Sequence, residues 1–440
     1  MAKKKYDESS IQVLETDRDI VQQKTTMFIP SRDKFGAMHI IFECIDNAID
    51  ELTTPDSPGK DVSVTFDVAT KDVTVTDNGT GIPQGRLYDL CTRLYASGKY
   101  NNSDKSHYQF SAGVNGIGNR LITYLSEYAE FTSMQNGKSL TYRFEDGFHK
   151  DSKETKCKDH GTIVKFRIDN KLVKINDLDV DDLIARYEEK SFISPDLHMT
   201  LTILNKGKTK KKYVYNGKTI ADRVEMMKPD TDILYDSAVE KVSVLENITD
   251  DKLTETKVPV EFALAFSEAA VEEEDPDKNI ISYGNTVKTY TGGQHVLGMR
   301  DAVVKFFRED LQPNFSKRDR ELEFVPSDVY KGLCGFVIAK VHKPEFKGQY
   351  KDQLMNPEVR RAVKDVVYNA LKNAKPAFQK KMGEFIIRVA RGRLDAKKAR
   401  TKSKDVANSF SKDRIKKYWP IIRTANTFEP EILLVEGYRN

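Results

Sequence analysis

The stretch ECIDNAIDE, residues 43–51, decides the fold of this chain. Around it, apolar residues recur at i, i+3, i+4 and i+7 from Met38 to Leu52, which predicts an amphipathic helix. Glu43 and Asn47 are one helical turn apart and therefore lie on the same side of that helix. A carboxylate in this position can take a proton from water, and an amide oxygen can bind Mg²⁺. Taken alone, the pair is more typical of a solvated helix face.

Two short segments with alternating apolar residues follow the helix, at 62–68 and 73–75. They predict a β-hairpin that ends at Asp77. The sequence DNGTGIP, residues 77–83, then places two glycines where a backbone can approach a ligand closely. A carboxylate here can accept a hydrogen bond from the amino group of a purine, although a turn aspartate has the same local sequence.

The glycine-rich sequence GVNGIG, residues 113–118, precedes a helix that we expect from Gly116 to Tyr128. Such loops aim backbone N–H groups and the positive end of a helix at phosphates. The sequence contains no G-x-x-x-x-G-K-S/T motif, and no βαβ unit precedes the loop, which excludes a P-loop and a dinucleotide fold. Lys99, just before a polar segment at 101–107, is either a phosphate ligand or a surface lysine. Together these parts predict a nucleotide triphosphatase that lacks a Walker A loop.

The composition of the 440 residues is that of a globular protein with two or three domains, with 39% hydrophobic and 31% charged residues. No apolar run approaches the roughly 20 residues that cross a bilayer, and the N-terminus lacks a signal-peptide core. The 4 cysteines form no C-x-x-C motif. We therefore expect reduced thiols, no zinc site, no membrane partner and a cytoplasmic location.

The second half of the chain has a different organisation. Alternating apolar residues predict strands near 258–266 and 334–341, and the sequence is typical of helices from Asn356 onward. Between Lys380 and Lys417, Lys and Arg far outnumber Asp and Glu. A basic helix is often only a solvated surface, but it also attracts the phosphates of nucleic acid.

The order and spacing of these motifs resemble the GHKL ATPases, and within them the ATPase subunit of type II DNA topoisomerases, of the gyrase B and ParE kind. The likeness covers nearly the whole chain. The matching runs are Tyr6–Leu14, Asn47, Asp77–Pro83, Tyr95–Tyr100, Tyr108–Gly118, Gly161–Thr162, Tyr290–His295 and Phe346–Lys351.

The resemblance implies an α+β chain in four parts. These are an N-terminal dimerisation arm at 1–30 and a GHKL (Bergerat) ATPase α/β sandwich at 31–220. A transducer domain like ribosomal protein S5 follows at 221–400, and C-terminal helices lead into a linker and the first strand of a TOPRIM domain at 401–440.

The resemblance also assigns roles to individual residues, with ATP and Mg²⁺ as cofactors. Glu43 activates water, and Gln349 and Lys351 reach the γ-phosphate. Asn47 holds Mg²⁺, and Glu436 is the equivalent of a TOPRIM metal ligand. The nucleotide contacts are Tyr6 (from the partner protomer), Asn47, Asp77, Gly79, Gly81, Ile82, Pro83, Lys99, Tyr108, Gly113, Val114, Asn115, Gly116, Ile117, Gly118 and Thr162.

By the same resemblance, ATP closes a homodimer that captures double-stranded DNA for strand passage. The TOPRIM Asp-Ser-Ala is replaced by residues 438–440, and the downstream D-x-D and the cleavage domain are missing. The chain is therefore either a piece of a longer protein or the product of a split gene. We expect TOPRIM and cleavage subunits as partners and no DNA cleavage by this chain alone. Departures from the family pattern at 24–30, at Thr80 and at Asn115 indicate a divergent member of the family, such as a phage-encoded enzyme. The alternatives are a MutL-like or Hsp90-like ATPase, or a non-catalytic DNA-binding scaffold of the same fold.

Overall fold

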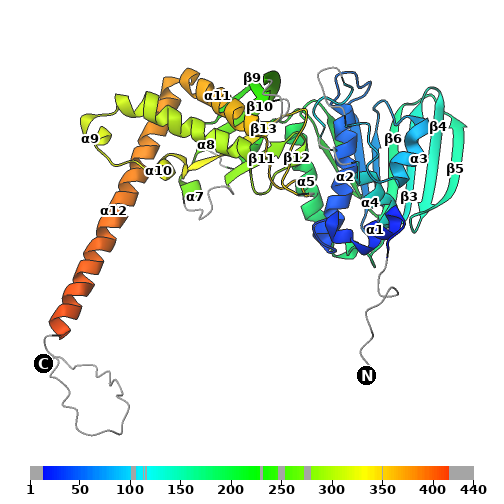
Figure 1. The fold of residues 1–440 in the computed structure, drawn as a ribbon, viewed down its shortest axis with the longest axis horizontal. Coiled ribbons are helices and arrows are strands. Elements are labelled where there is room, and N and C mark those ends of the chain that lie inside the picture. The colour runs from blue at the N-terminus through cyan, green and yellow to red at the C-terminus, as the bar shows by residue number, and fades with distance from the viewer. Residues whose placement is uncertain are drawn as a thin grey trace, which may run out of the picture.

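The computed structural model describes residues 13–100, 106–111, 113, 116–227, 231–245, 253–271, 279–348 and 350–415. It is built from two β-sheets that lie side by side, each with helices packed against it (Figure 1). A long C-terminal helix leaves the body of the molecule on the side of the second sheet (Figure 1). The α+β class predicted from the sequence is confirmed.

The first sheet has eight strands in the order β5-β4-β3-β6-β2-β1-β7-β8. Its neighbouring strands are antiparallel except for β1 and β7, which are parallel. In β1, Val62, Val64 and Phe66 are buried while Ser63 is exposed, so one face lies under helices and the other is polar. The strands are β1 Asp61–Asp67, β2 Val73–Asp77, β3 Ser126–Gln135, β4 Lys138–Glu145, β5 Phe148–Lys156, β6 Gly161–Ile168, β7 His198–Asn205 and β8 Lys208–Tyr215.

Helix α2, Lys34–Leu52, is the helix that the opening motif predicts. The Asp33 side chain caps it by accepting a hydrogen bond from Phe35 N at 2.9 Å. Its apolar stripe, which includes Ile41 and Ile45, is fully buried against the sheet. The polar side of α2 is therefore held in a fixed orientation along the sheet. The other helices of this part are α1 Asp17–Gln23, α3 Gln84–Thr92, α4 Gly118–Tyr124 and α5 Val180–Ile193, with 3-10 turns η2 Thr25–Met27 and η3 Ile175–Asp177.

One sequence-based expectation needs revision here. The helix predicted from Gly116 to Tyr128 is wrong at its end, because α4 stops at Tyr124 and strand β3 begins two residues later. Pairing of β3 with both β4 and β6 outweighs the local helical preference. In addition, residues 17–30, which the sequence places in an arm, contribute Val21 and Ile29 to the core of the first sheet.

The second sheet has five strands in the order β12-β11-β13-β10-β9, with β11 and β13 parallel. Its two faces bury alternate residues of β10. Phe262 and Leu264 pack under helices α8 and α11, whereas Ala263 and Ala265 pack with the ends of α5 and α6. The end of α5, which belongs to the first part of the chain, thus helps to cover one side of the second sheet. The strands are β9 Leu234–Leu245, β10 Leu253–Phe266, β11 Ile280–Gly284, β12 Val287–Lys288 and β13 Leu333–Ala339.

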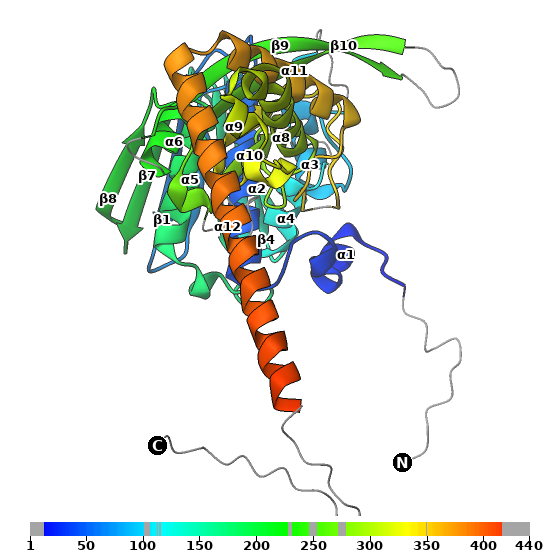
Figure 2. The same ribbon diagram turned by 90° about the vertical axis from the view of Figure 1, so that its left-hand side faces the viewer.

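The helices of the second part are mostly short apart from α8, α11 and α12. They are α6 Ile220–Met227, α7 Glu268–Val271, α8 Gln294–Phe306, α9 Lys317–Arg320, α10 Pro326–Tyr330, α11 Pro357–Asn373 and α12 Pro376–Ile415, with a π turn at Phe307–Leu311 and a 3-10 turn at Gln312–Asn314. Figure 2 shows the β9–β10 hairpin reaching outward at the top of the molecule, above α11.

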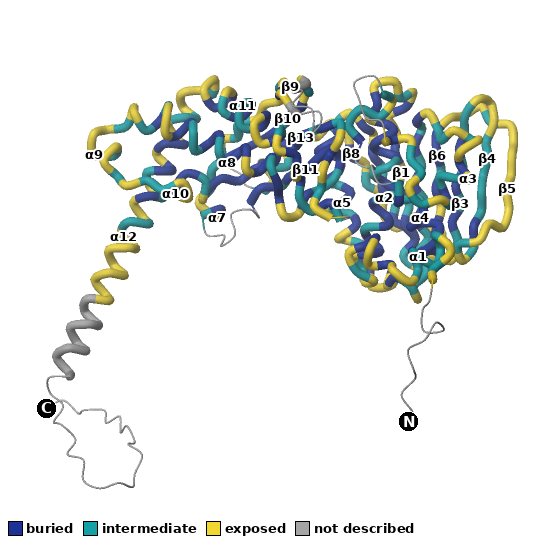
Figure 3. The backbone as a smooth tube through the Cα atoms, viewed as in Figure 1, coloured by how far each residue is buried: buried dark blue, intermediate teal, exposed yellow. Residues whose placement is uncertain are grey.

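Helix α12 is 40 residues long, and among its residues up to 404 the buried ones lie near its beginning. Met382, Phe385 and Ile386 are buried in the second core. Beyond them the helix projects from the body and its described side chains are largely exposed (Figure 3). Among the helices of the described ranges, none has the length and apolar character to cross a membrane. All 4 cysteines are free thiols, as predicted.

Candidate active site

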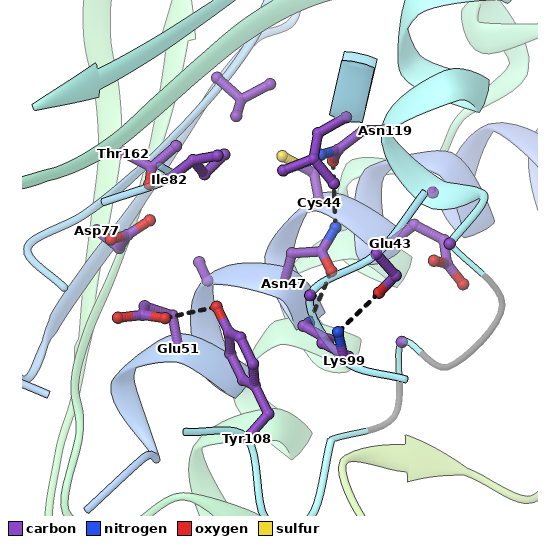
Figure 4. Close-up of a pocket in the computed structure, with 18 of the residues that line it drawn as sticks. Glu43, Cys44, Asn47, Glu51, Asp77, Ile82, Lys99, Tyr108, Asn119 and Thr162 are labelled. Atoms are coloured by element: carbon purple, nitrogen blue, oxygen red, sulfur yellow. Dashed lines mark hydrogen bonds between the residues drawn. The ribbon is translucent and has the colours of Figure 1, made fainter. Parts of the chain in front are cut away.

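A cavity of about 440 Å³ lies between α2, the ends of β2 and β6, and the loops that flank residues 101–105. Most of the sequence-predicted site residues line it. These are Glu43, Asn47, Asp77, Gly81, Ile82, Pro83, Lys99, Tyr108, Gly113, Gly116, Ile117, Gly118, Thr162 and Lys351. Figure 4 shows Asp77 and Thr162 at one end of the cavity and Glu43 and Asn119 at the other.

Asp77 forms the first end of the cavity. It is the last residue of β2 and pairs in register with Thr162 on β6. Its Oδ1 accepts a hydrogen bond from Gly79 N at 2.9 Å. Burial raises the pKa of Asp77 to about 6, against the effect of that hydrogen bond. Gly79 itself does not line the cavity, and its role is to turn the backbone so that its N–H orients the carboxylate.

Glu43 and Lys351 form the opposite end. Lys351 lies in the loop between β13 and α11, and its Nζ is 3.3 Å from Glu43 Oε1. Burial acts to raise the pKa of Glu43, but Lys351 and then His39 outweigh it and lower the pKa to about 2. Helix α2 and the loop before α11 thus each contribute one charge to the same end of the cavity.

At two of the loop glycines the structure leaves no room for a side chain. A Cβ on Gly118 would lie 2.7 Å from Glu43 Oε2, and one on Gly116 would lie 2.6 Å from Tyr100 Oη. Gly116 also has φ +57°, which favours glycine. The backbone of the loop therefore lies directly against the Glu43 end of the cavity.

Asn47 lies between the two ends and faces a cation. Its Oδ1 accepts a hydrogen bond from Lys99 Nζ at 3.0 Å, while its Nδ2 donates to Asn119 Oδ1 at 3.3 Å (Figure 4). The amide is therefore turned so that its oxygen points into the cavity. Within the described ranges no group of three His, Cys, Asp or Glu could hold a metal ion. An oxygen ligand of this kind fits Mg²⁺, which keeps several waters and phosphate oxygens in its coordination shell.

Glu51 is a cavity residue that the sequence analysis missed. Its Oε2 accepts a hydrogen bond from Tyr108 Oη at 2.7 Å and lies 3.2 Å from His107 Nε2, and its Oε1 accepts one from Thr80 N at 2.9 Å. These hydrogen bonds outweigh burial and lower the pKa of Glu51. The available signal was its position two turns after Glu43 on the same helix face. Other lining residues that the prediction omitted are Cys44, Ala96, Ser97, Gly98, Asn119, Arg120 and Gln135.

Five predicted site residues lie outside the described part of the chain. They are Tyr6, Val114, Asn115, Gln349 and Glu436. Their assignments stay predictions.

Comparisons with known proteins agree with this geometry. The family described as "Histidine kinase-, DNA gyrase B-, and HSP90-like ATPase" matches residues 32–172, and the family "DNA gyrase B" matches residues 219–405. The chain is 31% identical over 414 residues to the B subunit of DNA gyrase from Thermotoga maritima, covering 90% of this chain and 61% of that protein. It is 27% identical to the B subunit of DNA topoisomerase 4 from Staphylococcus epidermidis, covering 90% of this chain and 57% of that protein. The chain thus spans less than two thirds of these relatives.

Solved structures show the same fold. The 43K ATPase domain of Thermus thermophilus gyrase B, in complex with an aminocoumarin, superposes with a TM-score of 0.61 at 22% identity, covering 88% of this chain and 98% of that one. The ATPase region of Saccharomyces cerevisiae topoisomerase II superposes with a TM-score of 0.61 at 18% identity, covering 87% and 100%.

The fold and the cavity define a GHKL-type ATPase. Within that class, the match of the second half to DNA gyrase B separates the chain from MutL-like and Hsp90-like ATPases. The chain belongs to the family of gyrase B-type ATPase subunits of type II DNA topoisomerases.

Proposed function

We propose that this chain binds MgATP in the cavity of about 440 Å³, hydrolyses it, and acts as the ATP-operated gate of a type II DNA topoisomerase. One observation carries the proposal. Glu43 and Asp77 of the first part and Lys351 of the second part line a single cavity, so a nucleotide in it contacts both parts at once.

The two ends of the cavity suit the two ends of the nucleotide. The buried carboxylate of Asp77 accepts a hydrogen bond from the adenine amino group, with Thr162 beside it. The loop from Gly113 to Gly118 surrounds the phosphates with backbone N–H groups. Asn47 holds Mg²⁺, which neutralises phosphate charge when it is bound.

The hydrolytic step uses Glu43 and Lys351. With Lys351 at 3.3 Å, Glu43 has a pKa of about 2 and is a weak base. A γ-phosphate carries more negative charge than one carboxylate, so Lys351 turns from Glu43 to the phosphate. Glu43 then stays buried but loses its cation, its pKa rises, and it can take a proton from the attacking water. The γ-phosphate thereby activates the base that removes it.

The gate requires two copies of the chain and DNA. ATP joins two protomers, with the N-terminal segment that precedes α1 as the exchanged arm and Tyr6 inserted into the partner's site. The closed dimer captures a double-stranded DNA segment, which the basic surface of α12 attracts. The TOPRIM and cleavage parts of the topoisomerase complete the enzyme in the cytoplasm, with Glu436 as a TOPRIM metal ligand.

The Glu43→Ala variant tests the proposal. We expect ATP binding and an ATP-dependent doubling of mass in light scattering, with hydrolysis reduced by at least about 10²-fold. Glu127→Ala, at a half-exposed carboxylate of β3, is the matched control and should hydrolyse ATP like the wild type. Unchanged turnover in Glu43→Ala removes the residue from its role.

A further inference from the structure

A second cavity of about 360 Å³ adjoins the first and shares Glu43 and Lys351 with it. Helix α2 separates the two. Asn47 and Glu51, in its later turns, line the first cavity, while His39 and Asp46 line the second. The ion pair between Glu43 and Lys351 therefore lies where the two cavities meet.

The second cavity contains a cation that forms no ion pair with the described residues. Arg186 of α5 lines it, and the buried Nε of Arg186 has no hydrogen-bond partner in the described part of the chain. The guanidinium lies 4.2 Å from the centre of the Phe42 ring, which holds it in place. Two neighbouring cations are already paired: Lys190 with Asp46 at 2.5 Å and Lys288 with Glu189 at 2.7 Å. Asp352 also lines the cavity, as a carboxylate that has no ion pair with the described residues.

A second buried nitrogen without a described hydrogen-bond partner, on the imidazole ring of His39, lies nearby. The buried Nε2 of His39 has no hydrogen-bond partner in the described residues, and Glu43 Oε1 is 3.7 Å from it. Burial lowers the pKa of His39 to about 4, so the ring is neutral near pH 7 and can donate one hydrogen bond. One free guanidinium N–H and one imidazole beside a cavity are suited to a small oxyanion.

We propose that the second cavity receives the inorganic phosphate that hydrolysis releases. This inference rests on the proposed ATPase function. In the reaction, a water oxygen forms a bond to the γ-phosphorus, the bond from that phosphorus to the β–γ bridging oxygen breaks, and ADP leaves with the bridging oxygen. The water proton passes to Glu43 and then to solvent.

The direction from which water attacks the γ-phosphorus explains the route by which phosphate leaves. Attacking and leaving oxygens are in line on opposite sides of the phosphorus, so phosphate forms on the Glu43 side while ADP stays at the Asp77 end. Phosphate that leaves with Lys351 passes the point where the cavities meet and reaches Arg186. The phosphate then leaves without displacing ADP, and the contact of Lys351 with the nucleotide ends at the same moment.

The experiment follows a single turnover of ATP by the full chain. Quenched-flow sampling measures cleavage, and a fluorescent phosphate-binding protein measures release. We expect Arg186→Gln to lower the ratio of release rate to cleavage rate by about tenfold, since a cation that attracts a dianion is lost. Arg186→Lys should restore most of the ratio, and Arg361→Gln, at an exposed arginine of α11, should keep the wild-type ratio.

A measurement on the wild type does not depend on the variants. Calorimetric titration of inorganic phosphate into the chain saturated with ADP should give one phosphate site per chain, and Arg186→Gln should weaken it about tenfold. A wild-type ratio in Arg186→Gln, or no phosphate binding to the ADP complex, overturns the exit route while ATP hydrolysis stands. If the wild type does not hydrolyse ATP, or Glu43→Ala hydrolyses it normally, the proposed function itself fails.

Discussion

Thr286 Oγ1 donates a hydrogen bond of 2.8 Å to Asp50 Oδ1, and both residues are buried where the two sheets meet. The other carboxylate oxygen of Asp50 accepts a hydrogen bond from Lys99 Nζ at 2.8 Å. Thr286 lies in the turn between β11 and β12, whereas Lys99 lines the nucleotide cavity. Asp50 thus connects a cavity lysine directly to the second sheet. A phosphate that attracts Lys99 removes the cation from the Asp50 carboxylate, to which Thr286 donates its hydrogen bond.

The Thr286→Val change removes this hydrogen bond and keeps the shape of the side chain. We expect the free energy of unfolding to fall by about 1–2 kcal/mol, because the hydrogen bond that Thr286 donates to the buried Asp50 carboxylate is lost. Urea unfolding followed by fluorescence measures the loss. Thr291→Val, an exposed threonine a few residues later, is the matched control and should change the free energy by less than about 0.5 kcal/mol. Equal effects of the two variants would contradict a specific role for the contact.

The Asp77→Asn change should raise the stability of the nucleotide-free chain and abolish its binding of ATP. The pKa of Asp77 is raised to about 6 in the folded chain from 3.8, so its ionisation opposes folding above that range. The substituted amide cannot ionise, and we expect it to stabilise the nucleotide-free chain by about 2–3 kcal/mol at pH 8, with a smaller gain below pH 6. The same variant should no longer bind ATP. Unfolding curves at pH 8 and pH 5 and a calorimetric ATP titration measure both effects; tight ATP binding by the variant would count against the adenine contact.

The Lys351→Met change should release the carboxylate of Glu43. With burial kept and the cation removed, we expect the pKa of Glu43 to rise from about 2, as measured by NMR of ¹³C-labelled glutamate. The lowered pKa stabilises the wild type above pH 4.5, and this contribution disappears as the pH falls toward 2. The Lys351→Met variant should lack this stabilisation from the lowered Glu43 pKa already at pH 7.

The same variant should also lose the contact with the γ-phosphate. We expect turnover to fall by about 10²–10³-fold, since a preorganised charge at the transferring group is lost. Lys347→Met, at an exposed lysine of the same loop, is the control and should keep both the pKa and the turnover. A Glu43 pKa that stays near 2 in Lys351→Met would show that another group holds it.

The basic residues of α12 should divide into two sets. Arg388, Arg391 and Arg393, near its packed beginning, form ion pairs with the second part of the chain. Lys397, Arg400 and Lys404 are exposed on the projecting part.

Replacement of Lys397, Arg400 and Lys404 by Gln should weaken DNA binding and reduce the slope of log K against log salt by about 2–3, because each phosphate contact releases counterions. Fluorescence anisotropy with duplex DNA at several salt concentrations measures the slope. Replacement of Lys208, Lys210 and Lys212 on the exposed edge strand β8 removes the same charge and serves as the control. An equal loss in both triple variants would mean that net charge, and not α12, determines binding.

Several elements could be predicted from the sequence because their signals are local. The period of the apolar residues in α2 determines which side faces the sheet, and α2 begins and ends close to the predicted range. The alternation before Asp77 likewise places that residue at the end of a strand. The end of α4 was missed because β3 is specified by its two partner strands, which are distant in the sequence.

The sequence by itself determined which side chains α2 presents on its polar side and that Asp77 ends a strand, since both follow from periods of a few residues. Only the tertiary structure decided that Glu51 accepts hydrogen bonds from Tyr108 and Thr80 and that Arg186, unpaired among the described residues, lies beside a second cavity. It also decided that Lys351, 308 residues after Glu43, sets the pKa of that carboxylate. Contacts of this kind depend on how two sheets pack against each other, and packing is a property of buried surfaces that no local period of the sequence encodes.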